Sequence, residues 1–296
     1  VVSSQGRERD KIMQEAIKKA DVLIEALPYI RQFHNKIVVV KYGGSILGED
    51  KIRKGVLEDI VFMNFMGLKT ILVHGGGPNI SDRMRASGKK TDFVDGMRVT
   101  DEQTLKVVEE ELQKLNDMIV KEIMELGCQA VGMNGKENKL LAADKKKANI
   151  DLGLVGHITG INSKAILDAL DKDKVVVILP MGAGSDGKTY NVNADEAAAN
   201  VAEGLNAEKL VVLTNVKGIM RDPDDAGSFI STLTREEAKT LIDKKVVQSG
   251  MIPKVLACIH AINKGVKKTH MVDACIPHAL LLEIFTDQGI GTEIIS

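Results

Sequence analysis

Two short hydrophobic strands, each followed at once by consecutive glycines, constrain the fold of this chain more than any other feature. Residues 36–41 read Lys-Ile-Val-Val-Val-Lys and continue into Tyr-Gly-Gly-Ser at 42–45. Residues 70–73 read Thr-Ile-Leu-Val and continue into His-Gly-Gly-Gly-Pro at 74–78. With a helix expected between them at about 54–66, the pattern is typical of parallel β-α-β units, whose glycine turns face a ligand at the carboxyl ends of the strands. The chain is therefore predicted to be an α/β protein.

The composition excludes several classes of protein. The 296 residues, 44% of them hydrophobic, suffice for one large α/β domain or two modest ones. The 40 basic and 41 acidic residues leave a net charge of −1, so no overall field attracts the chain to nucleic acid or to an anionic membrane. No apolar run approaches the roughly 18 residues of a membrane-spanning helix, and no secretory signal is evident. Three separated cysteines predict a reduced, cytoplasmic protein without disulfides or a zinc site, and no metal-ligating residue is assigned.

Two long helices are predicted outside this strand pattern. Residues 10–27 carry apolar side chains at helical spacing, and Pro28 is expected to close that helix. The longest helix, about 101–126, is expected to begin at a capping box over 100–103, with Thr100 as the cap. Its apolar stripe suits packing against another helix.

The rest of the chain alternates between short strands and helices. Glycine-broken segments from 128 to 160 predict an antiparallel excursion. Further strands are expected at 175–179, 210–213, 269–273 and 291–295, and further helices after a cap at Asn193 and near 234–243, 249–264 and 278–284.

One segment matches a nucleotide-binding motif that we reject. Residues 182–189 read Gly-Ala-Gly-Ser-Asp-Gly-Lys-Thr, which fits the Walker A pattern. That motif needs a helix to begin at once, because the helix N-terminus and the loop amides hold the phosphates. Here the helix signal begins at Asn193, after a stretch with strand-like composition. A hairpin is the better interpretation, and its glycines make 182–187 the best candidate for a seam between two lobes.

Four charged residues have the sequence context of a phosphoryl-transfer site. Lys41 ends the first strand beside two glycines, and Arg98 precedes a helix, where it could bind a carboxylate. Asp195 lies in the first turn of a helix, and Lys254 follows a proline at the start of another. His74 is interpreted as a structural histidine. Each residue alone is ordinary, but together they predict phosphoryl transfer.

Six segments occur in the order and spacing of a known family: Lys41-Tyr-Gly-Gly44, His74-Gly-Gly-Gly-Pro78, Gly96-Met-Arg-Val-Thr100, Asn191-Val-Asn-Ala-Asp195, Leu213-Thr-Asn-Val-Lys-Gly218 and Ser249-Gly-Met-Ile-Pro-Lys254. Over about residues 20–296 the chain resembles the acetylglutamate kinases of the amino acid kinase superfamily. The resemblance implies an αβα sandwich around a mainly parallel open sheet of about eight strands. It also implies a helical extension for oligomerisation over 1–35, a lobe for the acyl amino acid over 36–181 and a nucleotide lobe over 182–296, on one continuous sheet.

The resemblance further implies a reaction and its residues. MgATP would phosphorylate the γ-carboxylate of N-acetyl-L-glutamate to N-acetyl-L-glutamyl 5-phosphate, the second step of arginine biosynthesis. The family's catalytic positions fall on Lys41, Lys254 and Asp195, the last as an organiser of the two lysines. Its acceptor positions fall on Gly44, Gly76, Gly77, Arg98 and Asn191. Its nucleotide positions fall on Gly43, Thr214, Asn215, Val216, Lys217, Gly218, Ser249, Gly250 and Met251.

The extension before the first strand resembles that of arginine-inhibited family members, in which an N-terminal helix interlaces three dimers. A homohexamer, built as a trimer of dimers, and inhibition by L-arginine are therefore expected. The C-terminal pattern predicts an arginine pocket to which Lys209, His270, Glu283 and Gly289 contribute. Glu283 would supply the carboxylate that a guanidinium group requires.

Two alternatives remain open from the sequence. One is a kinase of a related acidic acceptor, such as N-acetyl-aminoadipate, aspartate or glutamate. The segment 96–100 disfavours aspartate and glutamate, but one methylene is worth only about 1–3 kcal/mol of selectivity, so aminoadipate stays possible. The other is a non-catalytic arginine or nucleotide sensor, which the presence of both lysines and Asp195 disfavours.

Overall fold

An eight-stranded sheet forms the centre of the computed structural model, which describes residues 4–94, 96–222, 225–286 and 289–296. The strands run, in spatial order, β14 (Thr232–Thr234), β16 (Thr292–Ile295), β15 (Lys268–Asp273), β11 (Lys209–Thr214), β1 (Ile37–Tyr42), β2 (Lys69–His74), β8 (Val175–Leu179) and β5 (Ala130–Asn134). Within the sheet, β16 is antiparallel to β15, and the other neighbouring strands are parallel. The predicted mainly parallel α/β sheet is confirmed.

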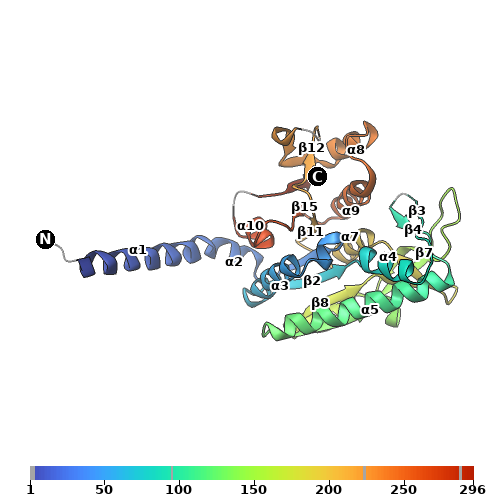
Figure 1. Cartoon of the computed structure of the whole chain (residues 1–296), viewed down its shortest axis with the longest axis horizontal. Coiled ribbons are helices and arrows are strands. Elements are labelled where there is room, and N and C mark those ends of the chain that lie inside the picture. Colours follow the sequence, from blue (N-terminus) through green and yellow to red (C-terminus); the bar gives the residue numbers. More distant parts are fainter. Residues whose placement is uncertain (1–3, 95, 223–224, 287–288) are drawn as a thin grey trace.

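Helices cover both faces of the sheet (Figure 1). Val38 and Val40 of β1 contribute to the core on one face and Val39 to the core on the other, as the two-residue period of a strand requires. One face packs against α3 (Asp50–Phe65), α5 (Glu102–Glu125) and α10 (Ala279–Ile284). The other packs against α6 (Ser163–Leu170), α7 (Ala194–Gly204), α8 (Arg235–Asp243) and α9 (Ile252–Asn263). Burial on both faces explains why these strands are continuous runs of Val, Ile and Leu.

A small closed barrel lies beside the sheet. It consists of β6 (Leu141–Lys145), β7 (Val155–Ile161), β9 (Met181–Gly184) and β10 (Thr189–Val192). The antiparallel excursion predicted for 128–160 is confirmed for β6 and β7 but is wrong for β5, which joins the main sheet parallel to β8. In the sheet, Val131 and Met133 of β5 pack against the core on one face and Ala130 against the core on the other.

The Walker-like segment is the hairpin between β9 and β10, in which Thr189 pairs with Ala183. The hairpin interpretation is thus confirmed, and no helix follows the glycines until α7. The predicted boundary between the two lobes, at residues 181 and 182, falls inside β9, so both residues belong to one paired strand. The division into two lobes stays a prediction.

Two helix ends differ from the sequence expectations. Pro28 does not close the first helix: α1 (Ser4–Glu25) ends earlier, and Pro28 lies in the first turn of α2 (Leu27–Phe33), where its missing N–H is harmless. The cap of α5 is Asp101, whose side chain accepts a hydrogen bond from the Thr104 N–H, and not Thr100. Thr100 is held in an extended conformation because it bridges to Gly153.

The remaining elements are short. They are α4 (Gly77–Ala86), the hairpins β3 (Phe93–Val94) with β4 (Met97–Arg98) and β12 (Ile219–Met220) with β13 (Phe229–Ile230), and 3-10 helices at Ser45–Gly48, Glu137–Lys139, Ala226–Ser228 and Ser249–Met251. In Figure 1, α1 extends away from the body of the molecule. Among the described residues, no helix combines the length and the apolar character that crossing a membrane requires.

Candidate active site

The glycine turns after β1 and β2 lie against each other at the carboxyl edge of the sheet. The Gly75 N–H donates to the Tyr42 carbonyl at 2.9 Å. A Cβ on Gly43 would lie 3.2 Å from both the Gly75 nitrogen and Lys41 Nζ, so a side chain there would crowd the turn and the lysine. Because the chain places β2 on one side of β1 and β11 on the other, this edge is where open α/β sheets bind ligands.

Lys41, Asp195 and Lys254 meet beside these turns. Lys41 Nζ lies 3.0 Å from Asp195 Oδ1, and Lys254 Nζ lies 3.3 Å from Asp195 Oδ2. The side chain of Asn193 caps α7 by accepting from the N–H groups of Asp195 and Glu196, as predicted, and so fixes the turn that carries Asp195. One carboxylate therefore bridges two ammonium groups from β1 and α9.

The burial of this cluster shifts its pKa values. Lys41 and Asp195 are both buried, and burial lowers the pKa of Lys41 although Asp195 opposes the change. Burial alone would raise the pKa of Asp195, but Lys41 and Lys254 together hold it below its usual range. Asp195 is therefore ionised at neutral pH and a poor proton acceptor, which suits it to holding the lysines.

A cavity of about 220 Å³ opens at this cluster. Lys41 and Asp195 line it, and so do all five residues predicted for the acceptor: Gly44, Gly76, Gly77, Arg98 and Asn191. The sequence-predicted residues are thus brought together by β1, β2, β4 and β10. Their roles stay predictions.

Arg98 is buried in the wall of this cavity. Its Nη2 donates to the Gly77 carbonyl at 3.0 Å and to Ser81 Oγ at 2.8 Å, and its guanidinium carbon lies 4.6 Å from the centre of the Phe93 ring. Burial lowers the pKa of Arg98. These partners are neutral, so the positive charge is available to an anionic ligand.

The strand of Arg98 is tied to the opposite wall. Thr100 Oγ1 donates to the Arg98 carbonyl at 2.7 Å and accepts from Asn191 Nδ2 at 3.1 Å. The cavity also receives the N-termini of α4 and α7, since Gly77 and Ala194 both line it. Two helix N-termini and two cationic side chains make it an anion site.

The predicted nucleotide residues lie on neighbouring segments. Thr214 ends β11, next to β1, and the side chains of Asn215, Val216 and Lys217 that follow are exposed. The 3-10 helix Ser249–Met251 precedes α9, and the Gly250 carbonyl lies 3.3 Å from Lys254 Nζ. For Ser249 the backbone alone is described. No group of three or more His, Cys, Asp or Glu side chains in the described ranges is placed to hold a metal ion.

Residues 36–273 match the model of the amino acid kinase family. The acetylglutamate kinase of Caldanaerobacter subterraneus subsp. tengcongensis is 50% identical over 281 residues, which cover 95% of this chain and 94% of that kinase. The acetylglutamate kinase of Desulforamulus reducens is 44% identical over 286 residues, covering 96% and 100%. This chain belongs to the acetylglutamate kinases. The resemblance inferred from the sequence is confirmed, and the chain is an enzyme of the amino acid kinase family that uses ATP.

Two solved structures share the fold of this kinase. One is N-acetylglutamate synthase from Neisseria gonorrhoeae in complex with coenzyme A and N-acetyl-glutamate, with a TM-score of 0.83 and 28% identity, covering 94% of this chain and 63% of the synthase. The other is the same synthase with coenzyme A and L-arginine, with a TM-score of 0.80 and 28% identity, covering 93% and 65%. The kinase thus spans somewhat under two thirds of the length of each.

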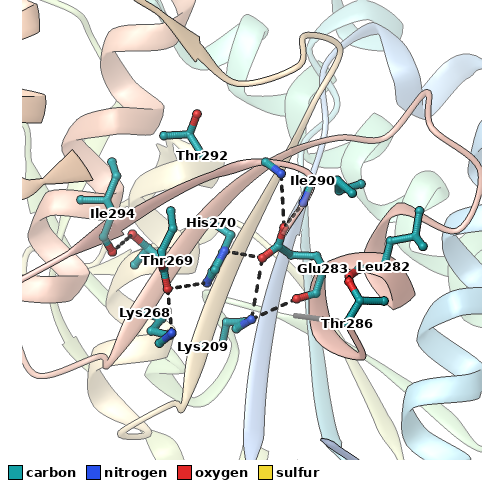
Figure 2. Close-up of polar contacts among 12 residues, drawn as sticks. Lys209, Lys268, Thr269, His270, Leu282, Glu283, Thr286, Ile290, Thr292 and Ile294 are labelled. Atoms are coloured by element: carbon teal, nitrogen blue, oxygen red, sulfur yellow. Dashed lines mark hydrogen bonds and ion pairs between the residues drawn. The ribbon is translucent and has the colours of Figure 1, made fainter. Parts of the chain in front are cut away.

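A second cavity, of about 530 Å³, lies at the amino-terminal edge of β11 and beside β15. All four residues predicted for arginine line it: Lys209, His270, Glu283 and Gly289. Figure 2 shows His270 pointing at the Glu283 carboxylate, and their Nδ1 and Oε1 atoms lie 2.5 Å apart. Lys209 Nζ donates to the Glu283 carbonyl at 3.3 Å.

The Glu283 carboxylate is already engaged within the protein. Its Oε2 accepts from the N–H groups of Ile290 at 3.1 Å and Gly291 at 3.3 Å (Figure 2). Burial alone would raise the pKa of Glu283, but His270 and Lys209 outweigh it and lower the pKa. Glu283 is therefore less available to a guanidinium group than the sequence suggested.

Sequence reasoning missed two charged residues of this second cavity, Lys268 and Glu293. Glu293 Oε1 lies 2.8 Å from Lys268 Nζ and 3.7 Å from His270 Nε2. Glu293 faces His270 because β16 pairs antiparallel with β15, with these two residues opposite each other. The alternation of residue types along the last strand could have indicated which side chains face inward, but not which residue Glu293 contacts. Ser81 and Phe93, which contact Arg98 at the first cavity, were also missed, because these contacts are tertiary.

Proposed function

We propose that the protein transfers the γ-phosphoryl group of MgATP to the γ-carboxylate of N-acetyl-L-glutamate, yielding N-acetyl-L-glutamyl 5-phosphate and ADP in the second step of arginine biosynthesis. The observation that carries this proposal is the bridge of Lys41, Asp195 and Lys254 at a cavity that also contains Arg98. An acceptor with two carboxylates fits such a cavity, because one can be held by the arginine while the other reaches the lysines.

The acceptor is held by residues of the first cavity. Arg98, whose partners in the protein are neutral, binds the α-carboxylate. Asn191, anchored to Thr100 through Nδ2, binds the acetamido group or the region of the α-carboxylate. The backbone N–H groups of Gly44, Gly76 and Gly77 surround the reacting end.

Phosphoryl transfer to this acceptor needs no general base. A γ-carboxylate has a pKa near 4.3 and is ionised at neutral pH. The obstacle is the approach of one anion to another, so catalysis consists of positioning and of charge neutralisation. Lys41 and Lys254 approach the transferred group from the two sides, and the amides of Gly44 and Gly76 donate to its oxygens. Asp195 holds the two ammonium groups in place, one on each of its carboxylate oxygens, and offsets their mutual repulsion.

The nucleotide is assigned to the carboxyl edge of β11 and to the start of α9. Residues 214–218 and 249–251, together with Gly43, border this region and support the assignment. Mg²⁺ enters as part of MgATP. In this proposal residues 36–181 form the acceptor lobe, 182–296 the nucleotide lobe and 1–35 the oligomerisation segment, and the enzyme works in the cytoplasm.

We further propose that L-arginine inhibits the enzyme by binding the second cavity. The presence there of Lys209, His270, Glu283 and Gly289 supports this proposal. Glu293 is the better carboxylate for the guanidinium group, because the Glu283 carboxylate already contacts His270, Lys209 and two backbone N–H groups. The exposed apolar side chains of α1 support a homohexamer, since Ile12, Val22, Leu23 and Ile24 are each more than 60% exposed.

The test is ADP release by the purified protein with MgATP and one acceptor at a time: N-acetyl-L-glutamate, N-acetyl-aminoadipate, glutamate or aspartate, each with and without L-arginine. We expect turnover with N-acetyl-L-glutamate and its suppression by arginine. Faster turnover with N-acetyl-aminoadipate than with N-acetyl-L-glutamate would mean that N-acetyl-aminoadipate is the acceptor. Turnover that arginine does not affect would refute the inhibitory site alone, and no ADP with any acceptor would favour a sensor.

A further inference from the structure

A buried histidine and a buried asparagine lie directly behind the glycine turn of β2. His74 is the last residue of β2 and Asn116 lies within α5, and neither is more than 1% exposed. Asn116 Nδ2 lies 3.1 Å from His74 Nε2 and donates to the Val177 carbonyl of β8 at 3.0 Å. His74 Nδ1 lies 3.1 Å from the Gly75 carbonyl oxygen. The pair therefore connects α5 and β8 to the turn.

These partners fix the tautomer of His74. The Gly75 carbonyl can only accept a hydrogen bond, so Nδ1 must carry the proton. The amide nitrogen of Asn116, directed by the Val177 carbonyl, can only donate, so Nε2 must be unprotonated. The ring is thus neutral, in agreement with its burial, which lowers the pKa of His74 to about 4.

The hydrogen bond from His74 sets the plane of the next peptide. The described peptide bonds are trans, and in a trans peptide the C=O and N–H groups point in opposite directions. Because the Gly75 oxygen points at the buried imidazole, the N–H of Gly76 points away from it, and Gly76 itself lines the cavity. The direction of this N–H is therefore decided by a side chain outside the cavity.

Packing behind the turn leaves this arrangement little freedom. A Cβ on Gly76 would lie 2.9 Å from Leu112 Cδ2 and 3.1 Å from Leu115 Cδ1, so α5 supports the turn directly. A Cβ on Gly132 of β5 would overlap Asn116 Oδ1, so a glycine opposite Asn116 is what allows its side chain to reach His74. The hydrogen bond from His74 adds to this packing by holding the peptide between two glycines, whose backbone angles are the least restricted of any residue.

We propose that His74, oriented by Asn116, is a positioning residue that directs the N–H of Gly76 at the phosphoryl group being transferred. The proposal deepens the function proposed above and rests on it, since it requires an anion at this place. His74 touches neither substrate and exchanges no proton during the reaction. Its contribution is a backbone donor that is oriented before the substrates bind, and a preorganised donor of this kind is worth about 10²–10³-fold in kcat in other enzymes.

Three variants test the proposal by ADP release with MgATP and N-acetyl-L-glutamate. His74→Leu, which removes the donor, is expected to lower kcat about 10- to 100-fold with little change in KM, because the N–H acts chiefly on the transferred group. His74→Asn, whose amide nitrogen can take the place of Nδ1, is expected to keep most of kcat. Thr70→Val is the matched control, since Thr70 is buried on the same strand and its hydroxyl has no hydrogen-bond partner among the described residues. Equal losses in His74→Leu and His74→Asn, or a normal kcat in His74→Leu, would overturn the proposal.

A second measurement does not depend on turnover. The ¹⁵N spectrum of histidine-labelled protein, with the His74 signal assigned from the His74→Asn variant, should show a proton on Nδ1 and none on Nε2 between about pH 6 and 8. A protonated Nε2 would overturn the positioning proposal even in an active enzyme. An inactive wild-type protein with a protonated Nδ1 would instead overturn the proposed function and leave the His74 arrangement standing.

Discussion

The cavity at Lys41 and the cavity at Glu283 are built around the same unit, a buried carboxylate between two basic groups, at opposite edges of one sheet. Asp195 contacts Lys41 and Lys254 at 3.0 and 3.3 Å, at the carboxyl edge. Glu283 contacts His270 at 2.5 Å and Lys209 at 3.9 Å, at the amino edge. In both, the basic groups outweigh burial and lower the pKa of the carboxyl group.

The two carboxylates differ in what else they bind. Asp195 contacts two lysine side chains, each with three N–H bonds. Lys254 also donates to the Gly250 carbonyl at 3.3 Å, which leaves N–H bonds on both lysines for a ligand. Glu283 also accepts from the backbone of Ile290 and Gly291, and so ties α10 and β15 to the segment before β16. In the proposed function, the first arrangement presents positive charge for phosphoryl transfer, whereas the second joins elements that a bound ligand could shift. Under that proposal, similar local chemistry serves reaction in one place and binding in the other.

The largest expected effect lies in the first cavity. Lys41→Ala and Lys254→Ala should each lower kcat by about 10³-fold or more, because each removes a charge placed against the transferred group. Initial rates of ADP release with both substrates near saturation measure this. Lys188→Ala, in the exposed β9–β10 hairpin, is the matched control and should leave kcat unchanged. A full loss in Lys188→Ala would place the nucleotide at the Walker-like segment instead.

A pH-dependent loss of stability should follow from His74. Its folded-state pKa, about 4, is below the unfolded value of 6.5, so the unfolded chain binds the proton first. The stability that the neutral ring contributes is complete above about pH 6.5 and is lost as the pH falls towards 4, by about 3 kcal/mol in all. Denaturant unfolding at several pH values should show a steeper acid loss for wild type than for His74→Asn. Equal slopes would mean that folding does not lower the pKa of His74.

The cavity arginine should affect binding more than rate. Arg98→Ala should raise the KM for N-acetyl-L-glutamate by about 10- to 100-fold, since a hydrogen bond to a charged group contributes about 1.5–3 kcal/mol, while kcat changes less. Steady-state kinetics with varied acceptor measure it, and Arg85→Ala, an exposed arginine of α4, is the control. A large loss of kcat with an unchanged KM would instead assign Arg98 to the transferred group.

The smallest expected effect tests which of the two carboxylates of the second cavity, Glu283 or Glu293, binds the guanidinium group. Glu293→Gln should raise the arginine concentration for half-inhibition about 10-fold and leave kcat unchanged, because it weakens one charged contact at the edge of the sheet opposite Lys41 and Lys254. Glu236→Gln, an exposed residue of α8, serves as control. A shift in arginine sensitivity with Glu283→Gln but not with Glu293→Gln would show that the guanidinium group binds Glu283 instead.

Local patterns in the sequence predicted much of the fold. The valine-rich run of β1 and the capping residue Asn193 were correctly located, because strand burial and helix capping depend on residues close in the chain. The cap of α5 was misplaced from Asp101 to Thr100, since the pairing of Thr100 with Gly153 is a tertiary contact. The strand β5 was wrongly assigned to an antiparallel unit for the same reason.

The sequence by itself determined which chemical groups this protein has and which element carries each one. Lys41, Arg98, Asp195 and Lys254 were all identified from motifs, each beside a glycine turn or a helix start. The tertiary structure decided how they meet: that one carboxylate bridges both lysines, that Glu293 faces His270, and that Asn116 reaches His74 behind the turn. Contacts of this kind join residues far apart in the chain, and they arise because strand order, register and helix packing bring those residues together.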